Sequence, residues 1–295
     1  MSETIASLRR KIKSAGDLQS VVRTMKALAA SNIGQYEESV QALADYYRTV
    51  ELGLGVCLRK IGTLPLTAEY KNQTSAGVIG AVVFGSDQGL IGRFNDLVVD
   101  YAVEALAAFP GKPKIWAVGE RVYARLTDAG LSPAGLFGVP NSIKAVAPLV
   151  GQILVESETR IGQSAVSELH LFYNHPTSGA GYAPIRQQLL PLDENWRLRL
   201  TLQQWPEGNL PEVIGGSTEV LRALIHEYLF VSLFRACAES LASENASRLA
   251  SMQRADKNID ELMEGLNSTF HRLRQSGIDE ELFDVITGFE ALNKG

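Results

Sequence analysis

Two long stretches without proline, one at each end of the chain, constrain the fold more than any other feature. The first extends from residue 3 to about residue 61, because Pro65 is the first proline, and the second extends from Ser217 to about Arg274. Apolar side chains in both stretches recur in alternating steps of three and four residues, which is the seam of a heptad repeat. A helix over the first stretch would be roughly 80–90 Å long at about 1.5 Å per residue, so it must protrude or pair.

We expect these helices, over residues 1–62 and 217–295, to pack antiparallel as a coiled coil. Two separate amphipathic helices on a larger core are the alternative. Gly16-Asp17 predicts a bend or break in the first helix, and Asp279 predicts the cap of a last segment after Ser276-Gly277. The first seam consists of Ile5, Leu8, Ile12, Ala15, Leu18, Val22, Met25, Ala29, Ile33, Tyr36, Val40, Leu43, Tyr47, Val50, Leu54, Cys57 and Ile61. The second consists of Leu221, Leu224, Tyr228, Val231, Ala238, Leu241, Asn245, Leu249, Met252, Ala255, Ile259, Leu262, Leu266, Phe270 and Leu273.

The central part of the chain, residues 74–192, has a different pattern. Residues 76–84 are a nearly continuous apolar run, which is typical of a strand buried on both faces. Alternating strand and helix patterns follow and predict a small, mostly parallel sheet, so the fold class is α/β, with a Rossmann-like domain inserted between the two long helices. Residues 193–216 are polar and contain Pro206 and Pro211, which predicts a linker or an outward loop. The further elements expected are strands at 114–118, 169–173 and 185–190 and helices at 94–109, 121–129 and 143–155.

Composition excludes several classes of function. The net charge of −5 argues against a nucleic-acid-binding surface, which needs a basic excess. The two cysteines, Cys57 and Cys237, lie in apolar helical patterns and are expected to be buried thiols. The sequence has no secretory signal and no apolar run near the ~20 residues that span a bilayer, so we expect a cytoplasmic chain without direct membrane insertion.

The glycine-rich segment Gly85–Gly92 is the strongest candidate for an enzymatic site, because it lies between an expected strand and an expected helix. It matches neither the dinucleotide pattern GxGxxG nor the phosphate-loop pattern GxxxxGK[ST]. Ser86 and Asp87 have no histidine nearby in the sequence. We therefore expect no catalytic residue, cofactor or metal in this chain. The alternative is a nucleotide-binding α/β enzyme with coiled-coil oligomerisation arms.

Four segments together resemble the γ subunit of F-type ATP synthases, and the resemblance covers nearly the whole chain. They are Leu8–Ile12 with Thr24–Ser31, Ser86–Gly92 followed by Asn95, Leu241–Arg248 with Met252, and Arg274-Gln275 with Ile278–Gly288. The family usually has KAMxxVAASK, (S/T)D(R/K)GLCGxxN, LASExxARMxAM and RQxxITxEIxEIVxGAxA in these places.

The sequence departs from the family at several positions of these motifs. Asn32 replaces a lysine, Ile91 replaces the loop cysteine, Asp279 replaces a threonine and Phe289 replaces an alanine. These departures are similar to the alternate, N-type branch found beside ordinary ATP synthases in some prokaryotes. A carboxylate at Asp279 puts that family contact in doubt, because it could repel acidic loops of the β subunit.

The resemblance implies a non-catalytic central-stalk rotor subunit of a rotary ATPase. Its partners would be the α and β subunits, which hold the nucleotides, the ε subunit and the membrane c-ring, with the complex on the cytoplasmic face of the inner membrane. A bare coiled-coil scaffold like the D subunit of V/A-type ATPases is a third possibility, against which the strand at 76–84 argues. Matching positions nominate as contacts with the α/β ring Met25, Glu244, Arg248, Arg274 and Gln275.

Overall fold

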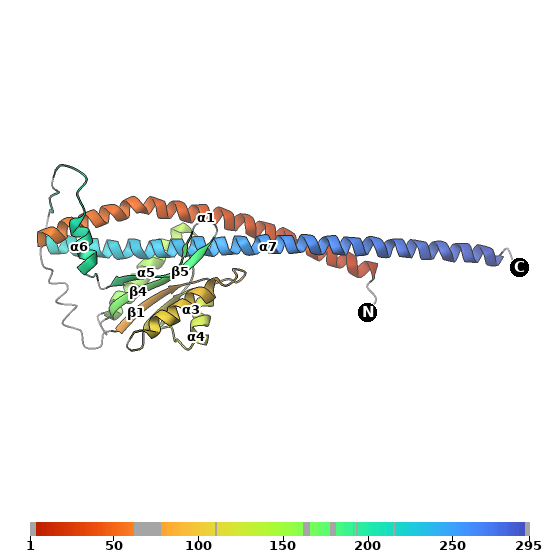
Figure 1. Ribbon diagram of the computed structural model, residues 1–295, viewed down its shortest axis with the longest axis horizontal. Helices are drawn as coiled ribbons and strands as arrows, with labels where there is room; N and C mark the ends of the chain where they lie inside the picture. Colours follow the sequence, from red (N-terminus) through yellow and green to blue (C-terminus); the bar gives the residue numbers. More distant parts are fainter. Residues whose placement is uncertain are drawn as a thin grey trace. The chain divides into compact units, whose positions relative to one another are not determined.

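The structure is a computed structural model, in which α1 (Ile5–Ile61) and α7 (Ser217–Leu292) are the longest elements (Figure 1). The chain divides into two compact units, which are described separately. Unit 1 consists of Met1–Ala29 with Leu249–Gly295, and unit 2 consists of Ala30–Arg248. The residues that the structure describes are 4–61, 78–109, 111–161, 166–177, 181–190, 192, 194–209, 211–214 and 216–292.

Unit 2 is built on a five-stranded sheet in the order β3-β2-β1-β4-β5. Every neighbouring pair is parallel except β4 and β5, which are antiparallel. Residues 76 and 77, expected at the start of the first strand, lie outside the described residues. β3 was not expected, because its three residues are too few to show a period. The strands are β1 (Val78–Phe84), β2 (Lys114–Val118), β3 (Gly135–Phe137), β4 (Val166–Pro176) and β5 (Tyr182–Leu190).

The central strand β1 is buried on both faces, which explains its continuous apolar sequence. Ile79, Ala81 and Val83 face one layer, formed by α3 (Phe94–Ala107) and α4 (Glu120–Asp128). Val82 and Phe84 face the opposite layer, in which α5 (Ile143–Ile161) packs together with α1 and α7. The sheet therefore joins the coiled-coil helices of unit 2 through its own hydrophobic core.

The two long helices are antiparallel in each unit, as expected from their seams. In unit 2, Asn32 lies beside Asn245 and Tyr47 lies beside Tyr228. The residue numbers on α7 therefore decrease as those on α1 increase, which is the order of an antiparallel pair. In unit 1 the same order holds for Arg9 over Phe270, and for Gln19, Arg23 and Lys26 around Asp256. No described helix is long and apolar enough to cross a membrane.

The breaks that the sequence suggested in the two long helices do not occur. α1 continues without a break through Gly16-Asp17, and α7 continues through Ser276-Gly277, so Asp279 is an interior helical residue and caps nothing. A glycine inside a helix costs only about 1 kcal/mol, which the rest of a long helix can offset.

The seam also shifts within unit 1. Leu18 is 54% exposed and Leu262 is 56% exposed, whereas their neighbours Gln19 and Met263 face the packed side. A helix of 3.6 residues per turn drifts away from a strict seven-residue repeat, which explains a shift by one position.

The segment 193–216, expected to be a linker or loop, contains a short helix, α6 (Glu194–Leu202). Leu200 is buried, and the ring of Trp196 packs edge-on against Tyr228 with centroids 5.2 Å apart. Trp196 and Leu200 are separated by four residues, so both lie on one face of a helix and anchor it. The prolines that suggested a loop lie beyond this helix.

Candidate functional site

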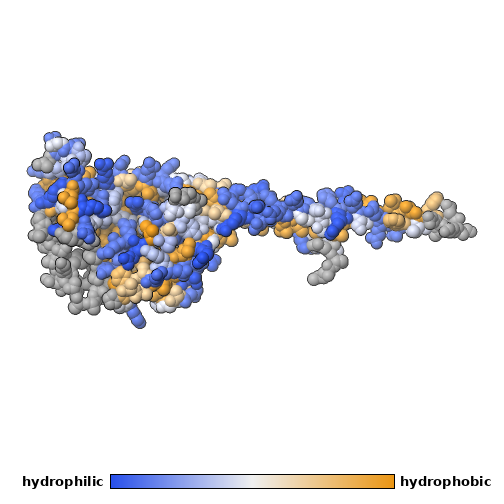
Figure 2. Space-filling view, in the orientation of Figure 1, coloured by the Kyte–Doolittle hydropathy of each residue, from blue (hydrophilic) through white to orange (hydrophobic). Residues whose placement is uncertain are grey.

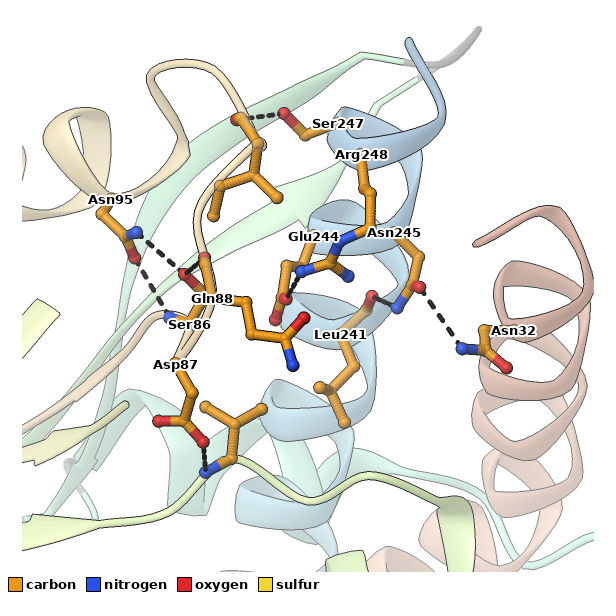
Figure 3. Close-up of polar contacts among 12 residues, drawn as sticks. Asn32, Ser86, Asp87, Gln88, Asn95, Leu241, Glu244, Asn245, Ser247 and Arg248 are labelled. Atoms are coloured by element: carbon orange, nitrogen blue, oxygen red, sulfur yellow. Dashed lines mark hydrogen bonds and ion pairs between the residues drawn. The ribbon is translucent and has the colours of Figure 1, made fainter. Parts of the chain in front are cut away.

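Asp87 lies in the loop that follows β1 and connects it to the segments that follow β2 and β3. One carboxylate oxygen, Oδ1, accepts the backbone N–H of Glu120 at 2.9 Å. The other, Oδ2, accepts the backbone N–H of Val139 at 2.9 Å, and Figure 3 shows this second hydrogen bond. Glu120 is the first residue of α4, so the carboxylate also occupies a helix N-terminus. Both oxygens therefore serve the fold, and the candidate catalytic carboxylate is a structural one.

Ser86 is buried and fully hydrogen-bonded within the same loop. Its backbone N–H donates to Asn95 Oδ1 at 3.1 Å, and its hydroxyl donates to the carbonyl of Gln88 at 2.9 Å and accepts from Asn95 Nδ2 at 2.9 Å. A serine nucleophile needs a base near its hydroxyl. The side-chain amide of Asn95 cannot act as that base. The serine and asparagine of the motif therefore hold the conformation of the loop through their hydrogen bonds.

A glycine lets two backbones approach closely at this edge of the sheet. Gly119 has φ +117°, and a Cβ there would lie 2.8 Å from the backbone of Ser86. The carbonyl of Ser86 in turn accepts the backbone N–H of Arg121 at 2.9 Å. In doubly wound folds a ligand occupies the edge at the carboxyl ends of the strands. Here backbone from the same chain lies against that edge.

Helix α7 packs on the far end of the loop. Ser247 Oγ donates to the carbonyl of Ile91 at 2.5 Å, and the hydroxyl of Tyr182, on β5, lies 3.3 Å from the same Oγ. Ile91 is 2% exposed. The side chain of Ile91 is therefore part of the packing between the loop and the rest of unit 2.

Glu244 and Arg248, two of the expected ring contacts, form a buried ion pair on the side of α7 that faces the loop (Figure 3). Arg248 Nη2 lies 2.6 Å from Glu244 Oε1. Burial raises the pKa of the Glu244 carboxyl, Arg248 partly opposes that rise, and the charge of Asp87 adds to it. Glu244 Oε2 and Arg248 Nε have no hydrogen-bond partner among the described residues.

The other three expected contacts lie in unit 1. Met25 is half-buried against the cluster of Val22 and Met252, whereas Arg274 and Gln275 are exposed. The structure thus brings Glu244 and Arg248 together in unit 2 and leaves Arg274 and Gln275 on an open helix surface.

An exposed apolar face near the C-terminus was missed by the sequence analysis. Sequence spacing had placed most of its residues on a helix, but it could not show that no other described segment packs against this helix. From Ile278 to Phe289 every side chain is exposed, and Figure 2 shows hydrophobic residues gathered on this stretch. The large exposed apolar side chains are Ile278, Leu282, Phe283, Val285, Ile286 and Phe289.

Comparisons with known proteins agree on one family. The family model described as ATP synthase matches residues 4–292. The ATP synthase gamma chain of Thermobifida fusca is 26% identical over 302 residues, covering 99% of this chain and 97% of that protein. The ATP synthase gamma chain of a Synechococcus species is 28% identical over 320 residues, covering 98% and 99%.

Solved structures show the same fold. A chain in the structure of the Euglena gracilis mitochondrial ATP synthase OSCP/F1/c-ring superposes with a TM-score of 0.60 and 18% identity, covering 99% of this chain and 95% of that one. A chain of the rotor of the same enzyme superposes with a TM-score of 0.59 over 93% and 98%. Since the family model spans nearly all of the chain and the curated relatives are matched along their full lengths, the chain belongs to the ATP synthase family, as one of its γ chains.

Proposed function

We propose that this chain is the rotor shaft in the central stalk of a rotary ATP synthase, on the cytoplasmic face of the membrane. It couples ion flow through the membrane c-ring to ATP synthesis or hydrolysis in the α/β ring. The chain performs no bond chemistry itself, because the nucleotides bind to the α and β subunits. Its contribution is mechanical: it changes the affinity of each catalytic site in turn as it rotates.

The observation that carries this proposal is the antiparallel pair α1 and α7, whose C-terminal helix ends in an exposed apolar face. An exposed apolar face on a helix marks a surface that a partner covers. A bearing inside a ring of three α/β pairs would cover such a helix from all sides. The 76 residues of α7 form one helix of about 114 Å at 1.5 Å per residue, which suits a stiff axle.

Among the nominated contacts, Arg274 and Gln275 are exposed just before the apolar face, which supports a direct contact with the ring. For Glu244 and Arg248, the support is the family resemblance alone, because their side chains are largely buried and pair with each other on the side of α7 that faces the loop. Met25 is half-buried. The exposed side chains of Val21 and Leu28 lie four residues before it and three residues after it, so the three share one face of α1, which supports a contact there.

Assembly tests the proposal directly. The full chain is co-expressed with the α and β subunits, and we expect it to co-purify with an α/β hexamer in a fixed ratio. Isothermal titration of the chain alone with ATP and with NAD should give no binding. Tight stoichiometric binding of either nucleotide, without co-purification of the hexamer, would favour the alternative nucleotide-binding enzyme. It would overturn the proposal that the chain is a rotor shaft.

Charge reversal tests the contacts. Arg274→Glu is expected to lower ATP-driven ion pumping of the assembled enzyme, and Met25→Lys is expected to do the same by placing a charge in a half-buried apolar position. Arg272→Glu is the matched control, because it makes the same reversal on another side of the helix. Wild-type pumping in both test variants would contradict the contact assignment.

A further inference from the structure

Glu239 is a buried carboxylate on α7 that is hydrogen-bonded to the edge of the sheet. The residue is 4% exposed. Its Oε2 accepts the hydroxyl of Tyr173 at 2.9 Å and lies 2.8 Å from His175 Nδ1, and both of these residues belong to β4. Its Oε1 accepts Nε–H of Arg235, one turn earlier on α7, at 2.7 Å. One side chain therefore connects the helix to two positions on a strand.

The chemistry of this connection makes it strong. Hydrogen bonds to an ionised carboxylate are roughly twice as strong as neutral ones, and the burial of Tyr173 and Glu239 shields the hydrogen bond between them from water. Burial and the neighbouring charge of Glu239 raise the pKa of Tyr173, so its phenol keeps its proton and remains a donor. Removal of the acceptor would leave the buried hydroxyl of Tyr173 without its partner.

A second polar connection joins the same helix to the sheet domain. Ser247 lies eight residues after Glu239 and contacts the carbonyl of Ile91 and the hydroxyl of Tyr182. Eight residues are a little over two turns, or about 12 Å along the helix axis. One connection alone would allow the helix to pivot on the sheet. Two connections on one side, about 12 Å apart, oppose both rotation and sliding.

Apolar packing is incomplete beside Glu239. A groove of about 380 Å³ opens there between α1 and α7. Val40 and Leu43 of α1 line it together with Val231 of α7. Its polar lining consists of Arg235, Glu239 and His175 with Glu37 and Gln41 of α1. Since side chains do not fill the groove, the polar connection must supply rigidity that close packing supplies elsewhere.

We propose that Glu239 is a positioning residue of the rotor, which transmits torque between the sheet domain and α7. The inference rests on the proposed function, in which the sheet domain and the far end of α7 contact different partners. Torque applied to the sheet reaches α7 through the shared hydrophobic core and also through Tyr173 and His175 of β4, which contact the carboxylate of Glu239.

The test uses the assembled enzyme in sealed vesicles and compares Glu239→Leu with Glu239→Gln. Leucine has a similar volume but no acceptor, so we expect ATP hydrolysis near the wild-type rate and a fall of about twofold or more in ions pumped per ATP. Glutamine keeps one acceptor oxygen for Tyr173 and His175, and we expect it to restore most of the ratio. Glu227→Leu is the matched control, because Glu227 lies on the same helix and accepts a hydrogen bond from Tyr46 on α1 instead of the sheet.

The outcomes separate this inference from the function on which it rests. If the wild-type chain fails to assemble with the α/β ring, the proposed function fails before any variant is compared. If the wild type assembles and pumps, and Glu239→Leu has the wild-type ratio of ions to ATP, the inference is wrong. A parallel loss of hydrolysis, pumping and thermal midpoint would indicate a purely structural role and also overturns it. Should Glu239→Leu fail to fold, Tyr173→Phe removes one donor alone, and an unchanged ratio in that variant has the same meaning.

Discussion

Two regions of α7 show opposite relations between polarity and burial. In the segment that faces the sheet, seven polar side chains are buried: Ser232, Glu239, Ser240, Ser243, Glu244, Asn245 and Ser247. In the segment from Ile278 to Phe289, all the large apolar side chains are exposed. Ordinary folding favours the reverse arrangement, in which apolar groups are buried and polar groups face water.

The difference shows that one helix has two kinds of neighbour. Serine and other short side chains allow the sheet to approach α7 closely, and most polar atoms there find partners within the chain. The C-terminal segment has no such neighbour among the described residues, and its apolar face is suited to a surface of another subunit. The first region stabilises the fold of the chain, and the second is suited to contact with another subunit.

The largest expected effect comes from placing charge on the exposed apolar face. Phe283→Asp combined with Ile286→Asp is predicted to weaken binding to the α/β ring by about 100-fold or more, because buried apolar anchors at an interface each contribute about 2 kcal/mol. The free energy of unfolding of the full chain should change by only about 0.5 kcal/mol, since both side chains are exposed. Competition binding to the hexamer and denaturant unfolding measure the two quantities.

Thr287→Asp provides a control for the chemistry of each substitution, because it adds one carboxylate at an exposed polar position beside the same turns. Its binding should remain within a few-fold of the wild type. A large loss of unfolding stability in the double variant, with normal binding, would break the comparison between the two regions.

The sequence predicted much of this architecture because the long helices and β1 carry repetitive signals. The apolar run at 78–84 must be buried on both faces, and the alternating steps of three and four residues can only be helical. The sequence could not predict that Met263, and not Leu262, faces the partner helix. The apolar face of an α-helix rotates gradually relative to a seven-residue repeat, so the residues that make contact depend on how the partner helix packs.

The polar connections were harder to predict for a different reason. Glu239 meets Tyr173 from a position 66 residues away, and Asp87 meets Val139 from 52 residues away. Their spacing along the chain contains no local period. The motif at 86–92 was found because of a family resemblance, but its use of both Asp87 oxygens for backbone N–H groups follows only from the folded loop.

An intermediate effect is expected at Ser243, which is 1% exposed and whose hydroxyl has no hydrogen-bond partner among the described residues. Ser243→Leu should lower the free energy of unfolding by about 1–3 kcal/mol, because the larger side chain cannot fit at this almost fully buried position. Ser243→Ala should be neutral or stabilising, because it removes a buried unpartnered hydroxyl.

Ser268→Leu carries the same substitution at an exposed position of α7, and its effect should be within about 0.5 kcal/mol. Denaturant unfolding of the three variants gives the comparison. Equal losses at Ser243 and Ser268 would show that the sheet-facing segment is not packed more tightly than the C-terminal one.

The smallest effect concerns the pH dependence of the buried polar region. Burial raises the pKa of Glu244 above its ordinary value of 4.5, so the folded chain binds a proton there more readily than the unfolded chain. The stability contributed by that proton is fully present below pH 4.5 and is lost as the pH rises through the raised pKa. The glutamine side chain of the Glu244→Gln variant cannot titrate, and its amide oxygen can still accept a hydrogen bond from Arg248. The variant should therefore gain stability relative to the wild type as the pH rises through this window. Unfolding midpoints measured at a series of pH values test this expectation. Parallel profiles for the two proteins would mean that the carboxylate is solvated, and the sheet-facing region of α7 would then differ less from its exposed end than the burial of its polar groups indicates.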